Sequence, residues 1–286
     1  MSSGRLFCFG LGYSAGFLAR ALGAEGWPVA GTSREGGDGE GGIRLHRFTR
    51  GARLAEPAAL LAGTTHLLVS VPPDALGDPV LAEHGGDIAA LAGLAWLGYL
   101  STTGVYGDCG GAWVDETAPL NPSGERGARR VAAEQGWLEL HRRRGVPAHV
   151  FRLAGIYGPG RSALDTVRAG RAQRVDKPGQ VFSRIHVADL VQVLRASMAR
   201  PAPGAIYNVC DDDPAPPEAV IAHACRLLGV PPPPLVPFDE AALSPMARSF
   251  YDDNKRVSNR RIKEELGVRL LYPSYRDGLA ALLAGG

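Results

Sequence analysis

The fold of this chain is decided by its opening stretch, Arg5-Leu6-Phe7-Cys8-Phe9-Gly10-Leu11-Gly12-Tyr13-Ser14-Ala15-Gly16. A short apolar run enters a glycine-rich turn, and apolar residues with helical spacing follow over 17–22. This order of strand, turn and helix is the context in which the pattern G-x-G-x-x-G/A binds a dinucleotide. Gly10 permits the tight turn, Gly12 lets the pyrophosphate approach the backbone, and Ala15 allows close packing of helix and strand. The pyrophosphate would lie at the helix N-terminus, where free N–H groups favour negative charge. The alternative is a glycine-rich turn without a ligand.

The second predicted strand, over 28–32, favours NADP over NAD. An NAD enzyme usually has an Asp or Glu at the end of this strand to accept hydrogen bonds from the ribose hydroxyls. No acid occupies that position here, where Thr32 and Ser33 offer hydroxyls instead. Arg34 follows with a planar cation that suits a phosphate, although it could equally be a solvated loop charge. Acidic residues within 35–40 would repel that phosphate, so NAD stays open as the second choice.

Composition excludes several classes of protein. The 286 residues are 45% hydrophobic and 21% charged, which suits one large domain or two unequal ones. The net charge of +2 comes with no basic stripe of interleaved aromatics, so we expect no nucleic-acid partner. The longest apolar run, 91–100, is too short for a membrane span, and the N-terminus lacks a signal-peptide pattern. We expect a cytoplasmic, metal-free protein, for which a homodimer is compatible with the sequence. Its cysteines have neither paired nor metal-binding spacing: Cys8, Cys109, Cys210 and Cys225.

Strand and helix patterns alternate through the first half of the chain, which predicts an α/β fold with a Rossmann-like, doubly wound parallel sheet. After the first two strands, further strands are expected at 43–48, 66–71, 95–100 and 148–153. Helices are expected between them at 56–62, 79–91 and 123–144. The stretch 35–42 is mostly glycine and acid, too poor for a helix, and predicts a flexible loop.

The second half of the chain predicts a smaller C-terminal lobe. Proline-rich stretches interrupt the pattern after residue 158. Helices are expected at 188–198, 218–228, 259–266 and 275–283, and a further strand of the main sheet at 205–209. We therefore expect residues 1–158, with 181–209 returning to them, to form an NAD(P)-binding Rossmann domain. Residues 159–180 and 210–286 would form a substrate-binding lobe over the carboxyl edge of the sheet, where open α/β folds bind ligands.

Four stretches carry motifs with a common pattern: Leu100–Gly107, Arg152–Arg161, Ile185–Leu190 and Ala205–Val209. They read S-[ST]-x-x-V-Y-G, R-x-x-x-x-Y-G-P-G, I-H-V-x-D-L and Y-N-V. In these motifs the chain resembles the extended short-chain dehydrogenase/reductase superfamily, the sugar-nucleotide epimerases and dehydratases, over nearly its whole length. The resemblance implies a Rossmann fold, a nicotinamide cofactor and a substrate hydroxyl bound by Thr102.

The resemblance breaks at the catalytic dyad. The superfamily's Y-x-x-x-K should open the helix at 123–144, where Arg126 takes the tyrosine position and Arg130 the lysine position. An arginine stays protonated at working pH and is a poor general base, although Arg130 could hold a ribose or phosphate. In this departure the chain resembles the atypical branch of the superfamily, which keeps the cofactor fold and loses the dyad.

The expected site residues fall into three groups. Catalytic candidates are Thr102, Tyr106 and Tyr157, the alternative for both tyrosines being that their rings only pack. Substrate-binding candidates are Thr103, Arg161 and Arg184, and Lys255 and Arg256 would either join the two arginines in an anion clamp or face solvent. The expected cofactor contacts are Gly10, Leu11, Gly12, Tyr13, Ser14, Ala15, Thr32, Ser33, Arg34, Ser70, Val71, Pro72, Ser101 and Arg130.

Two functions follow from these features. The first is an NADP-dependent oxidoreductase or epimerase that acts on a sugar-derived or other small substrate, with its proton donor displaced from the usual tyrosine. The second is a non-catalytic NADP-binding protein that senses redox state or regulates a partner. The missing dyad leaves both open, so the sequence does not establish that the chain is an enzyme.

Overall fold

The computed structural model describes residues 4–285, which form two compact units. The first unit contains the chain up to Thr102, Glu125–Arg152 and Val191–Tyr207. The second contains Thr103–Gly124, Leu153–Leu190 and the chain from Asn208 onward. Each unit is described separately below. The domain boundaries expected from the sequence stay a prediction.

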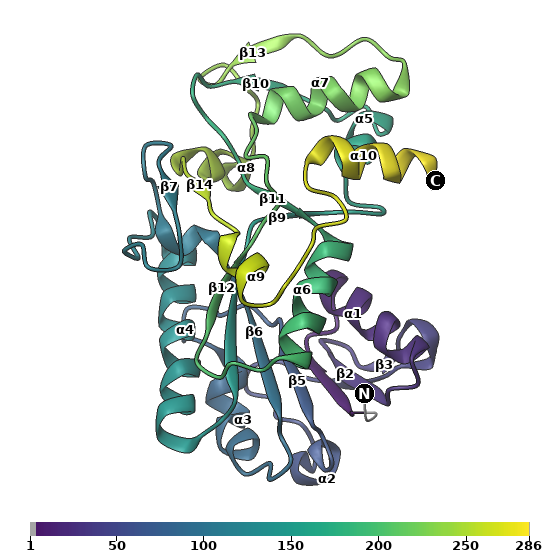
Figure 1. The fold of residues 1–286 in the computed structure, drawn as a ribbon, viewed down its shortest axis with the longest axis vertical. Helices are drawn as coiled ribbons and strands as arrows, with labels where there is room; N and C mark the ends of the chain where they lie inside the picture. Colours follow the sequence, from purple (N-terminus) through teal and green to yellow (C-terminus); the bar gives the residue numbers. More distant parts are fainter. Residues whose placement is uncertain (1–3, 286) are drawn as a thin grey trace. The chain divides into compact units, whose positions relative to one another are not determined.

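The central sheet has eight strands in the order β12-β8-β6-β5-β1-β2-β4-β3 (Figure 1). The pairs of β1 with β2 and β5, of β2 with β4 and of β5 with β6 are parallel. This is the α/β, Rossmann-like sheet that the alternating pattern predicted. The strands are β1 (Leu6–Phe9), β2 (Val29–Ser33), β3 (Gly37–Asp38), β4 (Arg44–Arg47), β5 (His66–Val69), β6 (Trp96–Thr102), β8 (Ala148–Leu153) and β12 (Ile206–Val209).

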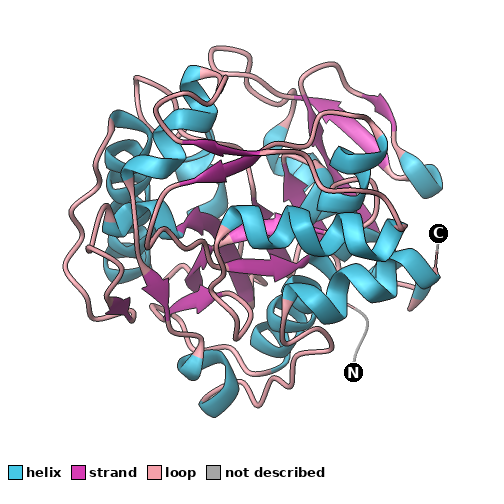
Figure 2. Ribbon diagram, turned by 90° about the horizontal axis from the view of Figure 1, so that it is seen from above, coloured by secondary structure: helices cyan, strands magenta, loops and turns pink. Residues whose placement is uncertain are grey.

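Helices cover both faces of this sheet (Figures 1 and 2). Successive strand side chains point to opposite faces, and both Phe7 and Cys8 are fully buried, so both faces are covered. Phe7 belongs to one core with Leu61, Ile88 and Trp137 from three of the helices. Because strands buried on both faces read as continuous apolar runs, they were easy to predict. The helices are α1 (Tyr13–Ala24), α2 (Pro57–Leu61), α3 (Pro79–Ala89), α4 (Glu125–Arg144) and α6 (Val187–Ala199).

The expected flexible loop over 35–42 is wrong in part. Two glycines with left-handed backbone, Gly36 (φ 77°) and Gly37 (φ 102°), reverse the chain after β2. The two residues of β3 then pair antiparallel with β4, and a 3-10 turn follows at Glu40–Gly42. The positive φ angles explain the many glycines, because residues with a Cβ avoid that region.

The second unit is built from short elements. Three two-stranded parallel pairs join β9 to β11, β7 to β14 and β10 to β13. A small core joins one of these strands to three helices and consists of Tyr157, Leu164, Val220, Tyr275 and Leu279. The sequence missed these strands because two or three residues show no periodicity. The elements are η2 (Thr103–Tyr106), β7 (Trp113–Val114), β9 (Gly155–Tyr157), α5 (Ala163–Arg168), β10 (Arg174–Asp176), β11 (Arg184–His186), α7 (Pro217–Leu228), β13 (Leu235–Pro237), α8 (Pro245–Ser249), η3 (Phe250–Asp252), β14 (Arg256–Val257), α9 (Arg260–Glu264) and α10 (Tyr275–Ala284).

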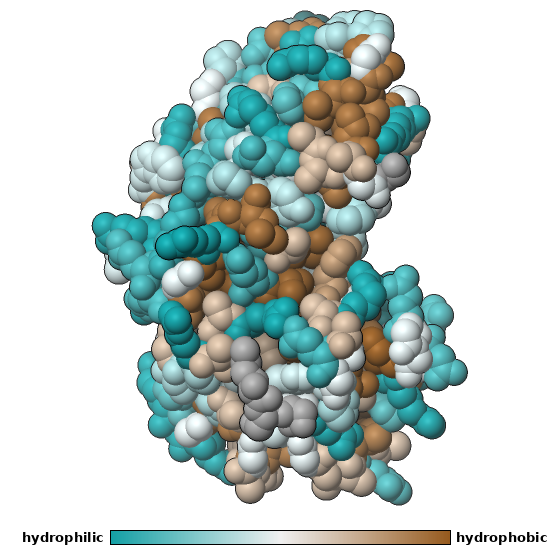
Figure 3. Space-filling view, turned by 45° about the vertical axis from the view of Figure 1, so that its right-hand side comes forward, coloured by the Kyte–Doolittle hydropathy of each residue, from teal (hydrophilic) through white to brown (hydrophobic). Residues whose placement is uncertain are grey.

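The surface mixes hydrophilic and hydrophobic side chains on the face drawn in Figure 3. Among residues 4–285, no helix has the length and apolar character needed to cross a bilayer. The same residues contain no group of three or more His, Cys, Asp or Glu side chains placed to hold a metal ion.

Candidate functional site

The glycine turn after β1 is fixed by hydrogen bonds from two neighbouring strands. Gly10 has a φ of +85°, and a Cβ there would lie 2.9 Å from Ser70 Oγ and 3.1 Å from the backbone nitrogen of Val71. Its N–H donates to Thr32 Oγ1 at 2.8 Å, and its carbonyl accepts a hydrogen bond from Ser70 Oγ. The N–H of Leu11 donates to the carbonyl of Thr32 at 2.8 Å. The end of β2 and the residues after β5 therefore hold the turn in one conformation.

Gly12 leaves open space in front of the first turn of α1. It is the N-cap residue, with extended backbone (φ −91°, ψ −160°), and a Cβ there would meet nothing within 4 Å. No side chain caps the helix, and its first turn carries no acidic residue. Ala15 is buried against the sheet, while Ser14 is half-buried and Tyr13 packs its ring 5.1 Å from that of Phe17. Uncapped N–H groups, the helix dipole and an open approach fit the pyrophosphate of a dinucleotide.

The chain carries an exposed cation at the end of β2, beside the expected ribose position. Ser33 Oγ accepts a hydrogen bond from the N–H of Gly36 at 2.8 Å and closes the turn, and Arg34 is exposed. Glu40, one of the acids expected to repel a phosphate, forms an ion pair with Arg20. That pairing offsets part of the negative charge in 35–40.

Ser101 is tied to a buried ion pair rather than held at the surface. Its Oγ donates to Glu134 Oε1 at 2.5 Å, and Glu134 Oε2 accepts from Arg152 Nη2 at 2.8 Å. The side chains of Glu134 and Arg152 are 2% and 3% exposed. Removal of one partner from such a buried pair typically costs about 3–5 kcal/mol. Arg152 begins one of the sequence motifs and Glu134 lies in the helix predicted over 123–144, but nothing in their spacing revealed that they pair.

Arg130, which takes the lysine position of the superfamily's dyad, lies on α4, and its side chain reaches the end of β6. Its Nη1 donates to the carbonyl of Leu100 at 2.5 Å, and its guanidinium carbon lies 5.9 Å from the ring centre of Tyr99. Two further candidates at the end of β6 belong to different units. Thr102 is the last residue of β6 in the first unit, and Thr103 is the first residue of η2 in the second. Ser70, Val71 and Pro72 follow β5 in that order. The backbone nitrogen of Val71 lies beside the glycine turn.

The two candidate tyrosines of the second unit differ. Tyr106 is 1% exposed and donates its hydroxyl to Asn208 Oδ1 at 2.7 Å, which favours the interpretation that its ring only packs. Tyr157 meets the ring of His186 edge-on at 5.2 Å and donates to the carbonyl of Ser274 at a long 3.4 Å. Burial raises the pKa of Tyr157, so its hydroxyl keeps its proton at neutral pH.

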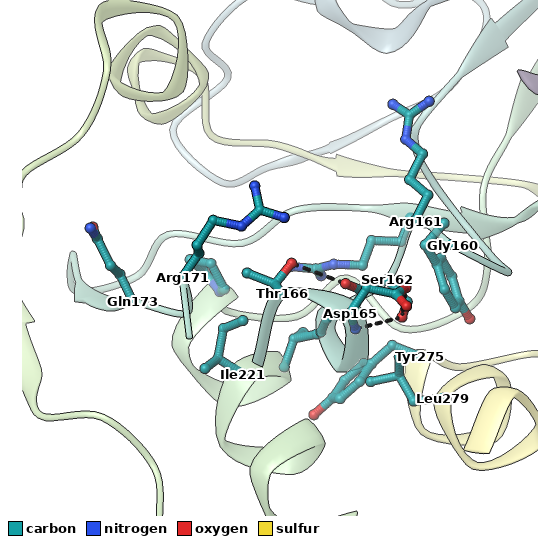
Figure 4. A pocket seen from close by; sticks show the side chains of 15 residues that line it. Gly160, Arg161, Ser162, Asp165, Thr166, Arg171, Gln173, Ile221, Tyr275 and Leu279 are labelled. Atoms are coloured by element: carbon teal, nitrogen blue, oxygen red, sulfur yellow. Dashed lines mark hydrogen bonds between the residues drawn. The ribbon is translucent and has the colours of Figure 1, made fainter. Parts of the chain in front are cut away.

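A cavity of about 550 Å³ lies within the second unit and contains three of the expected residues, Tyr157, Arg161 and Arg184 (Figure 4). No pattern in the sequence indicated its other walls, because they come from separate elements. They include Arg171, which follows α5, and apolar or aromatic side chains of α7 and α10, among them Ile221 and Tyr275.

Arg184 is held on the edge of this cavity by two backbone carbonyls. Its Nη1 donates to Phe182 at 2.8 Å and to Ala215 at 3.0 Å. The carboxyl of Asp211 is 1% exposed, and its Oδ2 has no hydrogen-bond partner among the described residues. Burial raises the pKa of Asp211 to about 8, so this acid is mostly protonated at neutral pH.

Lys255 and Arg256 are both tied to the loop after Tyr106, and for the buried Lys255 the expected solvated face was wrong. Lys255 is 8% exposed, and its Nζ donates to the carbonyl of Gly107 at 2.7 Å and pairs with Asp253 at 2.9 Å. Arg256 donates through Nη1 to the carbonyl of Gly111. These two cations therefore hold the loop that follows Tyr106.

The buried carboxyl of Asp211 should make stability depend on pH. Its folded-state pKa of about 8 exceeds the ordinary value of 3.8, so the folded chain keeps a proton that the unfolded chain releases. Between pH 4 and pH 8 this group should lower the free energy of unfolding as pH rises, by up to about 1.4 kcal/mol per pH unit. Urea unfolding at pH 5, 6, 7 and 8 should show a shallower fall for Asp211→Asn. Equal pH slopes for both proteins would contradict a buried, protonated Asp211.

The comparisons with known proteins give one family match and several similar chains. The NAD dependent epimerase/dehydratase family matches residues 87–210. Protein YeeZ of Escherichia coli (strain K12) is 30% identical over 283 residues, which cover 92% of this chain and 94% of that protein. A 3-diazoavenalumate denitrifying reductase of a Streptomyces species is 32% identical over 182 residues, 58% of each chain. A solved structure, described as a functionally unknown conserved protein from Silicibacter pomeroyi DSS, is 55% identical, covers 99% of both chains and superposes with a TM-score of 0.88.

Proposed function

We propose that this chain, which belongs to the NAD dependent epimerase/dehydratase family, is an NADP-dependent oxidoreductase or epimerase that acts on a sugar-derived or other small substrate. The observation that carries the proposal is the turn between β1 and α1, where Gly10 is held in a left-handed conformation and Gly12 faces open space. When bound there, the nicotinamide cofactor would supply or accept hydride. One relative carries the name reductase, in agreement with such chemistry.

The chain's own side chains would divide the remaining work. Thr102 would donate a hydrogen bond to the oxygen of the substrate at which hydride is added or removed. Arg126 would not act as the base, because an arginine side chain is a poor general base. Tyr157 stays protonated at neutral pH because burial raises its pKa, and it is the candidate proton donor of the second unit. Arg130, fixed on the carbonyl of Leu100, would support the cofactor at the end of β6.

The preference for NADP rests on Arg34. This arginine is exposed directly after β2, where the family of NAD-binding Rossmann folds usually has an acid. Arg34→Ala should weaken NADPH binding by about 1.5–3 kcal/mol, the usual contribution of a hydrogen bond to a charged group, and leave NADH nearly unchanged. Fluorescence titration with each cofactor measures both values.

Arg44→Ala is the matched control for Arg34→Ala. Arg44 is also exposed, but it begins β4 and pairs in register with Ala30, away from the end of β2. Its replacement should change neither affinity. An equal loss of NADPH and NADH in Arg34→Ala would show that this residue does not distinguish the 2′-phosphate.

A non-catalytic NADP-binding sensor is the second candidate, favoured by the arginines in the dyad positions and by the buried Tyr106 hydroxyl. A screen of sugar nucleotides and short carbonyl compounds for oxidation of bound NADPH separates the two functions. Turnover of any of them that depends on protein concentration supports the enzyme. Tight NADPH binding without turnover across the whole screen supports the sensor.

A further inference from the structure

The cavity of the second unit combines one supported cation with apolar walls. Arg184 lies on β11 and contributes its guanidinium, while Val220 and Ile221 of α7 and Tyr275 and Leu279 of α10 contribute aromatic and aliphatic surface. A ligand that fits such a site has an anionic group at one end and an apolar body at the other.

The hydrogen bonds that hold Arg184 at the cavity use a single nitrogen of its guanidinium. Both of its hydrogen bonds to carbonyls, those of Phe182 and Ala215, use Nη1. The Nε–H and Nη2–H bonds of an arginine point in parallel from the opposite edge, and this edge matches the two oxygens of a carboxylate. Because the carbonyls already hold the group in place, little side-chain entropy would be lost when an anion binds.

Arg184 forms no ion pair within residues 4–285, although it interacts electrostatically with Asp211 and Asp213. Its hydrogen-bond partners, the carbonyls of Phe182 and Ala215, are neutral. A partly buried cation that no ion pair neutralises is costly, and an anion supplied by a ligand would offset that cost.

Three other polar residues of the cavity, Ser162, Asp165 and Thr166, hydrogen-bond with one another. Ser162 Oγ donates to Asp165 Oδ2 at 2.6 Å, and Thr166 Oγ1 donates to the carbonyl of Ser162 at 3.0 Å. Figure 4 shows Arg161 and Arg171 with their guanidinium groups extended away from Tyr275 and Leu279. Of the three arginines that line the cavity, Arg184 is the one held in place by two backbone carbonyls, and it suits a single charged group.

We propose that this cavity binds an organic monocarboxylate with an aromatic body, its carboxylate on the Nε and Nη2 edge of Arg184 and its ring between α7 and α10. The claim that such a carboxylate is the substrate rests on the proposed function. The claim that the cavity binds it does not. The chemistry differs from that of a nucleoside diphosphate, which would need several cations.

The test is a titration of the full chain, without cofactor, with 2-naphthoate and with its neutral counterpart 2-naphthamide. Calorimetry should show 2-naphthoate binding at least about tenfold more tightly than the amide, because only the carboxylate pairs with Arg184. Arg184→Lys keeps the charge but loses the two-pronged edge, and should weaken 2-naphthoate about tenfold or more. Arg168→Gln is the control, since it changes an exposed arginine at the end of α5 that does not line the cavity, and it should leave the affinity within about twofold.

A second variant protects the test against a structural effect at Arg184. Ile221→Trp fills the apolar wall without touching the arginine, and should also abolish 2-naphthoate binding. Equal affinity for the acid and the amide, tighter binding of UDP than of 2-naphthoate, or unchanged binding in both variants would overturn the proposal. NADPH titration of the same protein keeps the two proposals apart: loss of 2-naphthoate binding with NADPH binding intact rejects only the carboxylate site.

Discussion

NADPH should bind the Gly12→Val protein about a hundredfold more weakly than the wild type, a loss of about 3 kcal/mol. The isopropyl group would project into the open space before α1, where the pyrophosphate is expected to contact the backbone. Nothing within 4 Å obstructs a Cβ at this position, and the extended backbone of Gly12 is one that valine adopts readily. The variant should therefore fold normally, and the loss should come from the ligand.

Gly23→Val is the matched control for Gly12→Val. Gly23 lies near the other end of α1, and a Cβ there also meets nothing within 4 Å. Both substitutions add the same side chain to the same helix, but only Gly12 faces the expected pyrophosphate. Fluorescence titration should show wild-type affinity for Gly23→Val. A folded Gly12→Val protein that binds NADPH as tightly as the wild type would remove the glycine turn from the cofactor site.

Turnover should fall about a hundredfold in Thr102→Val and remain largely intact in Arg126→Ala. Valine keeps the shape of threonine but deletes the hydroxyl that would hydrogen-bond the substrate oxygen in the transition state, and the loss of one such donor typically costs a factor of that size. Arg126 is expected to contribute no general base, because an arginine side chain is poorly suited to that role. Initial rates measured with the substrate identified by the NADPH oxidation screen provide the comparison.

Tyr157→Phe and Tyr106→Phe, measured in the same assay, locate the proton donor. Each removes only a hydroxyl, and the hydroxyl of Tyr106 is already committed to Asn208. Tyr157→Phe should therefore have the larger effect on rate. If Arg126→Ala alone abolished turnover while NADPH still bound, Arg126 would be an electrostatic catalytic group and the assignment of roles would have to change.

The cofactor half of the molecule could be predicted from sequence because its signals are local. The glycine turn, the two strands beside it and helix α1 all lie within residues 6–33, and their order alone identifies the site. Even there one element was missed, since β3 has two residues and depends on pairing with β4. Strand ends also shifted by one or two residues, because pairing with neighbours rather than composition sets them.

The second unit was much less predictable because its interactions join distant residues. Arg184 was expected to bind substrate, but the partners that define its cavity, Ile221 and Tyr275, lie on helices far along the chain. The contact of Lys255 was unpredictable for the same reason, since its side chain reaches Gly107, which lies 148 residues away in the sequence. No periodicity or spacing encodes such contacts.

The buried pair of Glu134 and Arg152 has a consequence for behaviour in concentrated salt. Mobile ions screen charges that they can approach, with a Debye length of about 3 Å at 1 M. On α4 they can approach the exposed pair of Glu125 with Arg129, and that pair should lose its attraction. They cannot enter the space around Glu134, whose side chain is 2% exposed. The attachment of α4 to β6 and β8 should therefore persist at ionic strengths that cancel the charge pairs on its outer face.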